Sequence, residues 1–175
     1  VTDRWAALGS DFVITALPAD YYDFTVWSGD VEPAQVSNAS VTVVIDRPLN
    51  VTANFAARLA THDVPQWWLA SYGWTSDFDA AALDDQDGDG MPTWMEHVAL
   101  TVPTNKQSVL RIVTNPGRTA GQEAVLSWLS ATGRLYDVDI RSNLVNDGWA
   151  PYASGLAAHP PQNVFTGAVG SGRVL

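Results

Sequence analysis

Two stretches of alternating apolar and polar residues constrain the fold of this chain more than any other feature of its sequence. In the first stretch, "DFVITALP" places Phe12 and Ile14 on one side, and "DFTVW" places Phe24 and Val26 on one side. The segments "SVTVVID" and "NVTANF" continue the same period of two. Successive side chains of a strand point to opposite faces, so the pattern predicts half-buried antiparallel strands over residues 1–57.

The alternation returns near Ser108. "VLRIV", "AVLSWL" and "RLYDVDIRS" are predicted strands, and the last of them places Tyr136, Val138 and Ile140 on one face. The final stretch is rich in glycine, proline and small residues and has room for one or two edge strands. A second β module is therefore expected at the C-terminal end of the chain.

The segment between the two β stretches loses the alternation and favours short helices. "AARLATHDVPQ" is predicted to be a connector, and "PQWWLASYG" a short helix that ends at Gly73. A second helix is expected to begin after Ser76 or Asp77, and a third near Pro92. The prediction is a mainly β, multi-module chain with three parts, 1–57, 58–107 and 108–175.

An acidic segment, "DQDGDGMPTWME", lies inside the helical part. It matches the calcium-loop pattern D-x-[DN]-x-[DN]-G-x5-E at every required position. Calcium takes six to eight oxygen ligands, and the glycine at position 6 allows the sharp turn that aims the carboxylates inward. The predicted ligands are the carboxylates of Asp85, Asp87, Asp89 and Glu96, the carbonyl of Met91, and Thr93 acting directly or through a water.

This segment has two other interpretations. A solvated acidic turn near a helix N-terminus would also place aspartates here, but a chance match at so many fixed positions is rare. Magnesium is disfavoured because a cage with this many protein oxygens suits the larger ion. Position 8 is Pro92, which has no N–H to donate to a partner loop, and no second matching loop exists in the sequence. A solitary structural calcium site is therefore predicted.

Composition and motifs exclude several classes of function. The net charge of -10 and a pI near 4.4 disfavour nucleic-acid binding. No apolar run approaches the roughly 20 residues of a membrane helix, and no cysteine is present for disulfides or thiolate sites. His62, His97 and His159 have no zinc-like spacing, and no hydrolase or phosphate-loop motif occurs. We expect a non-enzymatic protein, and the missing initiator methionine suggests a piece of a longer one.

Eight tryptophans are the main argument for a ligand-binding surface. Exposed rings of Trp67, Trp68, Trp74 and Trp149 could form a platform for sugars. Trp67 and Trp68 are adjacent, so on a helix their side chains point about 100° apart and cannot both face one core. Packing within or between modules is the favoured interpretation of these rings, and a sugar platform is the alternative.

The motifs "WWLASYG", "FDAAALDDQDGDGMPTWMEH", "SVLRI", "LSW", "GRLYDV" and "SNL…GW" resemble a C-terminal module of large exported bacterial proteins. That module joins a short helix and a thrombospondin-type-3-like calcium loop to a small β-sandwich, and the resemblance covers about residues 65–175. Two departures stand out. The module usually has a G-T-[DN]-P stretch where this chain has Leu100, Thr101, Val102 and Pro103, and it usually closes with an aromatic "FYR" strand that is missing before Leu175.

Residues 11–55 resemble the internalin-B-type B-repeat, a small β-grasp-like module of bacterial surface proteins, through "ITALPADYYDF", "WSGD" and "VTANF". Both resemblances imply an extracellular or cell-surface location. They also imply a non-enzymatic role as a spacer, adhesive unit or other structural module. The calcium ion predicted from the loop pattern is the expected stabilising cofactor. The alternatives are a carbohydrate- or protein-binding module, or a self-assembling filament or surface-layer subunit. The expected partners are a calcium ion and, as alternatives, a glycan, another surface protein or copies of the chain itself. Nucleic-acid binding and membrane insertion are not expected.

Overall fold

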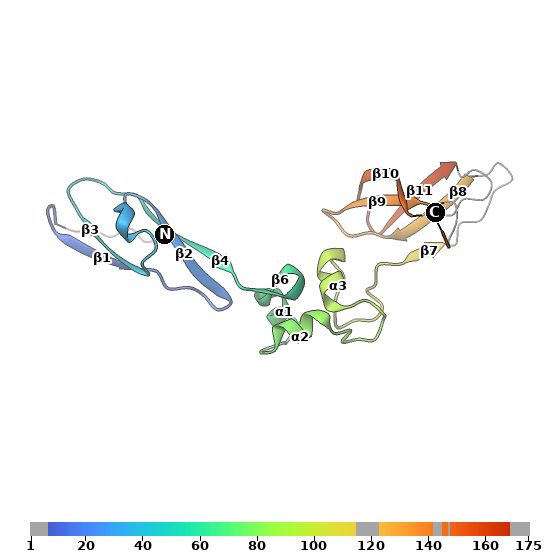
Figure 1. The fold of residues 1–175 in the computed structure, drawn as a ribbon, viewed down its shortest axis with the longest axis horizontal. Helices are drawn as coiled ribbons and strands as arrows, with labels where there is room; N and C mark the ends of the chain where they lie inside the picture. The colour runs from blue at the N-terminus through green and yellow to red at the C-terminus, as the bar shows by residue number, and fades with distance from the viewer. Residues whose placement is uncertain (1–6, 115–122, 142–144, 147, 169–175) are drawn as a thin grey trace. The chain divides into compact units, whose positions relative to one another are not determined.

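The computed structural model describes residues 7–114, 123–141, 145–146 and 148–168 (Figure 1). The fold is mainly β, as predicted, with several antiparallel sheets and only short helices. The chain divides into two compact units, residues 1–82 and 83–175. The sequence pattern had placed the helical segment in a part of its own, with boundaries at residues 57/58 and 107/108. In the structure the boundary between the two units falls inside that segment.

Within residues 7–57, four strands and a short 3-10 turn form the N-terminal β module. The elements are β1 (Asp11–Thr15), β2 (Tyr22–Gly29), the turn η1 (Pro33–Gln35), β3 (Ser40–Val44) and β4 (Val51–Ala57). β1 pairs with β3 and β2 pairs with β4, both antiparallel. Ala16, Trp27 and Val41 form the buried core between these pairs. The Trp27 indole N–H donates to the carbonyl of Asn38 at 2.8 Å, which satisfies the one polar group of that ring.

A β-bulge in β2 makes one prediction wrong. The register with β4 shifts between Phe24 and Val26, so one extra residue interrupts the alternation. Phe24 still packs against the core, but Trp27 is buried and Val26 is 38% exposed. The strict period of two had placed Val26 on the inner face. The bulge moves that face one residue along the chain.

The remainder of the first unit is a small helical segment. β5 (Leu59–Ala60) and β6 (Val64–Pro65) form a short ribbon around the 3-10 turn η2 (Thr61–Asp63), and α1 (Gln66–Ser71) and α2 (Phe78–Leu83) follow. Both helices were predicted. Val64 and Leu69 are fully buried, and Ala81 and Ala82 face inward from α2. The Asp79 carboxylate accepts hydrogen bonds from the backbone N–H and the hydroxyl of Thr61, which ties α2 to the ribbon.

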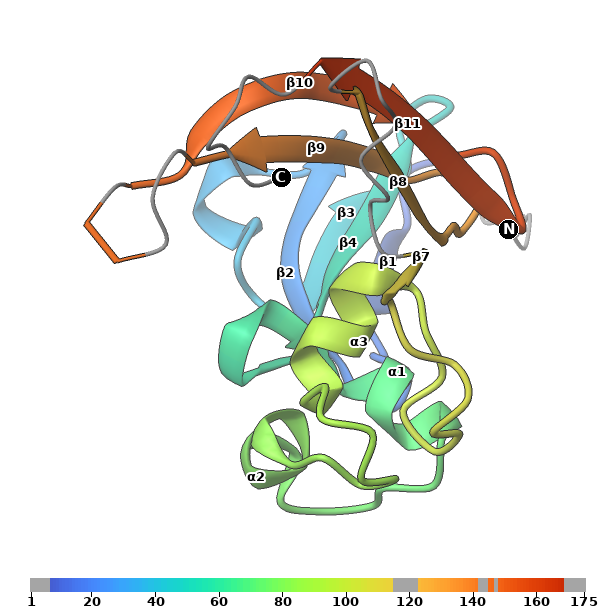
Figure 2. The ribbon, with the colours of Figure 1, turned by 90° about the vertical axis from the view of Figure 1, so that its right-hand side faces the viewer.

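The second unit begins with the acidic loop and α3 (Thr93–Ala99), and continues into a small sandwich of two antiparallel sheets. One sheet has the order β11-β8-β7 and the other pairs β10 with β9, as Figure 2 shows. The strands are β7 (Ile112–Thr114), β8 (Glu123–Leu129), β9 (Leu135–Ile140), β10 (Ala150–Ala157) and β11 (Gln162–Ala168). Leu126 and Trp128 of one sheet and Val138 of the other form the core.

The predicted inner face of β9 is confirmed, because Val138 and Ile140 are buried while Asp137 and Asp139 are exposed. One or two edge strands were expected in the final stretch: β11 lies within it, and β10 begins five residues earlier and ends inside it. Some sequence features of the resemblances lie outside the described residues: "SNL" at 142–144, the chain start at 1–6, and the end at 169–175.

Candidate metal centre

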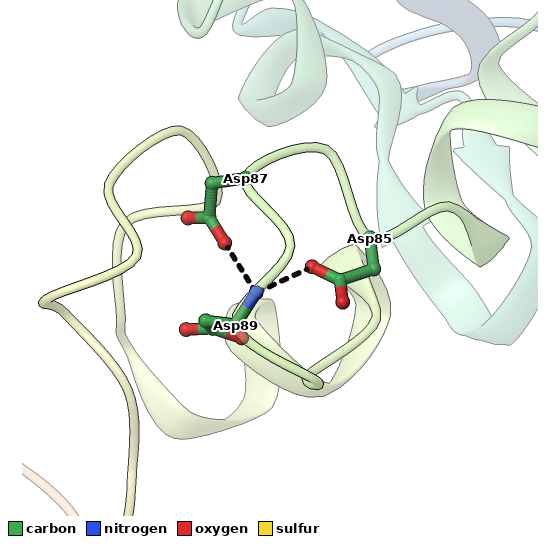
Figure 3. Close-up of side chains that lie close together, drawn as sticks. All are labelled: Asp85, Asp87 and Asp89. Carbon is green, nitrogen blue, oxygen red and sulfur yellow. Dashed lines mark hydrogen bonds between the residues drawn. The ribbon is translucent and has the colours of Figure 1, made fainter.

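Three aspartates of the acidic loop converge on one point, as Figure 3 shows. Oxygens of Asp85, Asp87 and Asp89, one from each, lie within 4.8 Å of one another. Gly88 and Gly90 have positive φ values of 74° and 95°, a conformation that glycine adopts without steric cost. These two glycines let the loop turn sharply enough for alternate aspartates to face the same centre.

Backbone N–H groups of the loop hold the carboxylates in place. Asp85 accepts from Gly88 at 2.9 Å and from Gly90 at 2.8 Å, and the Asp89 N–H lies 3.2 Å from oxygens of both Asp85 and Asp87. The Met91 N–H donates to Asp89 at 2.8 Å. These bonds fix the carboxylates near one another although their charges repel, so the loop is organised around its anionic centre.

Glu96 is the buried residue of the predicted ligand set, and it does not belong to the group of oxygens that lie within 4.8 Å of one another. Its side chain is fully buried on α3, and its Oε1 accepts a 3.2 Å hydrogen bond from the Thr101 hydroxyl. Burial raises the pKa of this carboxyl to about 7; the Thr101 hydrogen bond partly opposes this, and the negative charges of Asp87, Asp89 and Asp85 raise it further. A carboxylate in this position is costly unless a positive charge joins the centre.

The tight turn after α3 positions that hydrogen bond. Leu100 caps the helix in the left-handed conformation with φ 58°, and both Leu100 and Thr101 donate backbone N–H groups to the carbonyl of Glu96. Such a left-handed cap is usually glycine, because a Cβ disfavours it. The turn directs the Thr101 side chain back toward Glu96. The sequence prediction did not include Thr101 in the site. Its position five residues after Glu96, just beyond the end of the helix, is the feature of the sequence that could have indicated it.

The donor set fits a calcium ion. Among the described residues, three buried carboxylate oxygens have no hydrogen-bond partner: Asp87 Oδ2, Asp89 Oδ2 and Glu96 Oε2. Buried polar atoms are normally paired, so orphaned carboxylate oxygens on Asp87, Asp89 and Glu96 favour a nearby cation. All the donors are hard oxygens, which is the chemistry of Ca²⁺ rather than of zinc or copper.

The two remaining predicted ligands have clear structural roles. Thr93 is fully buried, and its N–H and hydroxyl both donate to the carbonyl of Asp84, at 2.8 and 2.9 Å. These bonds fasten the start of the loop to the start of α3. The Met91 sulfur lies 3.8 Å from the Thr101 hydroxyl. Neither contact tests whether the Met91 carbonyl or the Thr93 hydroxyl binds an ion, so both remain predictions.

The sandwich contacts the C-terminal end of α3. The Arg134 guanidinium, in the turn between β8 and β9, donates to the carbonyl of His97 at 2.9 Å. The last carbonyls of a helix lack intrahelical partners, and a cation there is favourable. Burial, with a contribution from the Arg134 charge, lowers the pKa of His97. The acidic loop, α3 and the sandwich are thus connected within one unit.

The four tryptophans of the predicted platform have different environments. Trp67 is 43% exposed, whereas the adjacent Trp68 is buried and packs edge-on against Tyr72, so the two rings do not share a face, as predicted. Trp74 is half-buried. These three belong to the first unit, and Trp149 belongs to the second, where it is 53% exposed.

Comparison with known proteins identifies one module. The family model described as "Divergent InlB B-repeat domain" matches residues 2–59, about a third of the chain. This match confirms the B-repeat resemblance expected for about residues 11–55, and the N-terminal β module is therefore similar to a bacterial surface repeat. No curated protein and no solved structure matches the chain. The resemblance over residues 65–175 stays a prediction. None of the described helices has the length and apolarity needed to cross a membrane.

Proposed function

We propose that this chain is a calcium-stabilised structural module of a secreted or cell-surface bacterial protein, without enzymatic activity. The match of residues 2–59 to a B-repeat supports a surface role. The observation that carries the calcium assignment is the fully buried Glu96, whose Oε2 has no partner among the described residues and which lies close enough to three aspartates for their charges to raise its pKa.

In this proposal the ion offsets part of the negative charge of four carboxylates and joins the loop to α3. Asp85, Asp87 and Asp89 supply oxygens from the loop, and Glu96 supplies the unpaired oxygen from the helix. The Met91 carbonyl and Thr93 complete the shell. Because the ion binds only the folded loop, its binding free energy adds to the stability of the second unit. Extracellular calcium is abundant enough for sites as weak as about 10⁻⁴ to 10⁻³ M to fill.

Calorimetric titration of metal-free protein with calcium tests the assignment. One ion per chain is expected, with magnesium binding at least about tenfold more weakly because it tolerates this cage poorly. Asp87→Asn is expected to lower calcium affinity by about tenfold or more. Asp84→Asn is the matched control, since it removes the same charge one position before the loop and leaves the ligand set intact. The assignment is wrong if millimolar calcium gives no binding heat, or if both variants behave alike.

A further inference from the structure

A groove of about 430 Å³ opens on the C-terminal sandwich, away from the acidic loop. It is lined by residues of β7, β8 and β9 and by Trp149, which directly precedes β10. Its apolar wall includes Ile112 and Leu126. The volume lies within the range of small-molecule sites, and the lining combines apolar surface with a few polar groups, as such sites do.

Three aromatic rings line the groove, and neighbouring groups hold each of them. Trp128 and Tyr136 pack edge-on with ring centroids 5.5 Å apart, and the Tyr136 hydroxyl accepts a 2.9 Å hydrogen bond from the backbone N–H of Ala131. The Arg141 guanidinium carbon lies 4.9 Å from the centroid of the Trp149 ring. The rings are therefore positioned before any ligand arrives, although Trp149 remains 53% exposed.

The polar groups of the groove require a ligand with both donors and acceptors. The indole nitrogen of Trp128 is buried and has no hydrogen-bond partner among the described residues, which is unusual for a buried tryptophan. Arg111 and Asp139 also line the groove and are exposed. A purely apolar ligand would leave these three groups unmatched, and a polyanion is disfavoured by the net charge of -10.

We propose that this groove binds a neutral pyranose unit of an oligosaccharide. The C–H face of a pyranose ring is flat and apolar and stacks on an indole such as Trp149, while its hydroxyl groups both donate and accept. A hydroxyl oxygen would accept from Trp128 Nε1, and other hydroxyls would bond to Asp139 and Arg111. This site is distinct from the predicted platform, because it uses Trp149 together with Trp128 and Tyr136 and none of the tryptophans of the first unit.

The test is calorimetric titration of the whole chain, in calcium buffer, with four neutral probes: cellotetraose, xylotetraose, mannotetraose and tetra-N-acetylchitotetraose. At least one probe is expected to bind at millimolar concentration. Trp149→Ala is expected to weaken that binding about tenfold or more, and Trp128→Phe, which keeps a ring but removes the N–H, about tenfold. Trp67→Ala is the matched control, because it removes a ring of similar exposure from the first unit and is expected to change nothing.

Three results would overturn the proposal. The first is that no probe binds while the wild type is folded by circular dichroism. The second is that Trp67→Ala weakens binding as much as Trp149→Ala does. The third is that an extended peptide of alternating valine and threonine binds instead of every sugar, which would make the groove an acceptor for a strand at β9.

Discussion

Replacing Glu96 by glutamine is expected to stabilise the calcium-free protein and to destabilise the calcium-bound protein. Glu96 is fully buried, and its pKa is raised from an ordinary value of 4.5 to about 7. The folded state therefore holds a proton that the unfolded state releases between these two pH values. It follows that the stability of the calcium-free protein falls as the pH rises from 4.5 through 7.

The size of the effect follows from that pKa. Moving a carboxyl pKa from 4.5 to about 7 corresponds to about 3 kcal/mol of lost stability at about pH 8. Glutamine carries no charge and keeps an oxygen that accepts from the Thr101 hydroxyl, so the calcium-free variant recovers most of this energy. For a unit of roughly 90 residues this amounts to a rise in unfolding temperature of roughly 10–20 °C. In calcium the order reverses, because glutamine cannot supply the bidentate charged ligand.

Thermal unfolding followed by circular dichroism at about pH 8, with a chelator and then with millimolar calcium, measures both effects. Asp84→Asn serves as the control, because its exposed carboxylate lies outside the ligand set and its backbone carbonyl still accepts from Thr93. If glutamine at position 96 lowers stability in the chelator as well as in calcium, the carboxyl is not strained by burial and the reasoning is refuted. The reasoning would also be refuted if Asp84→Asn raised the unfolding temperature in the chelator as much as Glu96→Gln does. General repulsion among the acidic residues would then explain both increases.

Three further substitutions test the surroundings of the site and the first module. Leu100→Gly removes a non-glycine residue from the left-handed cap of α3 and should raise stability by about 1 kcal/mol; an unchanged or lower unfolding temperature would contradict this. Thr101→Val deletes the hydrogen bond to Glu96 and should weaken calcium binding about tenfold in calorimetry, whereas Thr101→Ser should not. Gly29→Ala places a Cβ against the carbonyl oxygen of Asn50 at a φ of 94°. It should cost on the order of 3 kcal/mol in urea unfolding, and a fully stable alanine variant would show that this turn can relax.

The predictable parts of the structure were those set by local pattern. The loop spacing predicted the grouping of Asp85, Asp87 and Asp89, because turn geometry and glycine positions decide where those side chains point. The alternation predicted the inner face of β9, because successive side chains of a regular strand point to opposite faces. It failed at Val26, because a bulge depends on the pairing with β4 and leaves no mark in the sequence of β2 alone.

The unpredicted parts depend on residues brought together from separate segments. Thr101 joins the site through the left-handed turn at Leu100. The resembled module usually has glycine at that position, so the leucine here did not indicate a turn. The groove needs Trp128 and Tyr136 from two strands and Trp149 from a loop, and no spacing rule connects those positions. The motif predicted Glu96 as a ligand, but it could not predict that Glu96 is buried, because burial depends on the tertiary packing around α3.

The first and last carboxylates of the loop have a mechanical consequence for the chain. Asp85 and Glu96 are the outermost ligands of one proposed ion, so a bound cation closes the segment between them into a ring. Fully extended under tension, that segment would span about 40 Å. The acidic loop begins just after the boundary between the two units. When the calcium-loaded chain is pulled from its ends, this segment would therefore stay compact until the ion is released. A single-molecule force trace would record the release of the ion as a separate extension step.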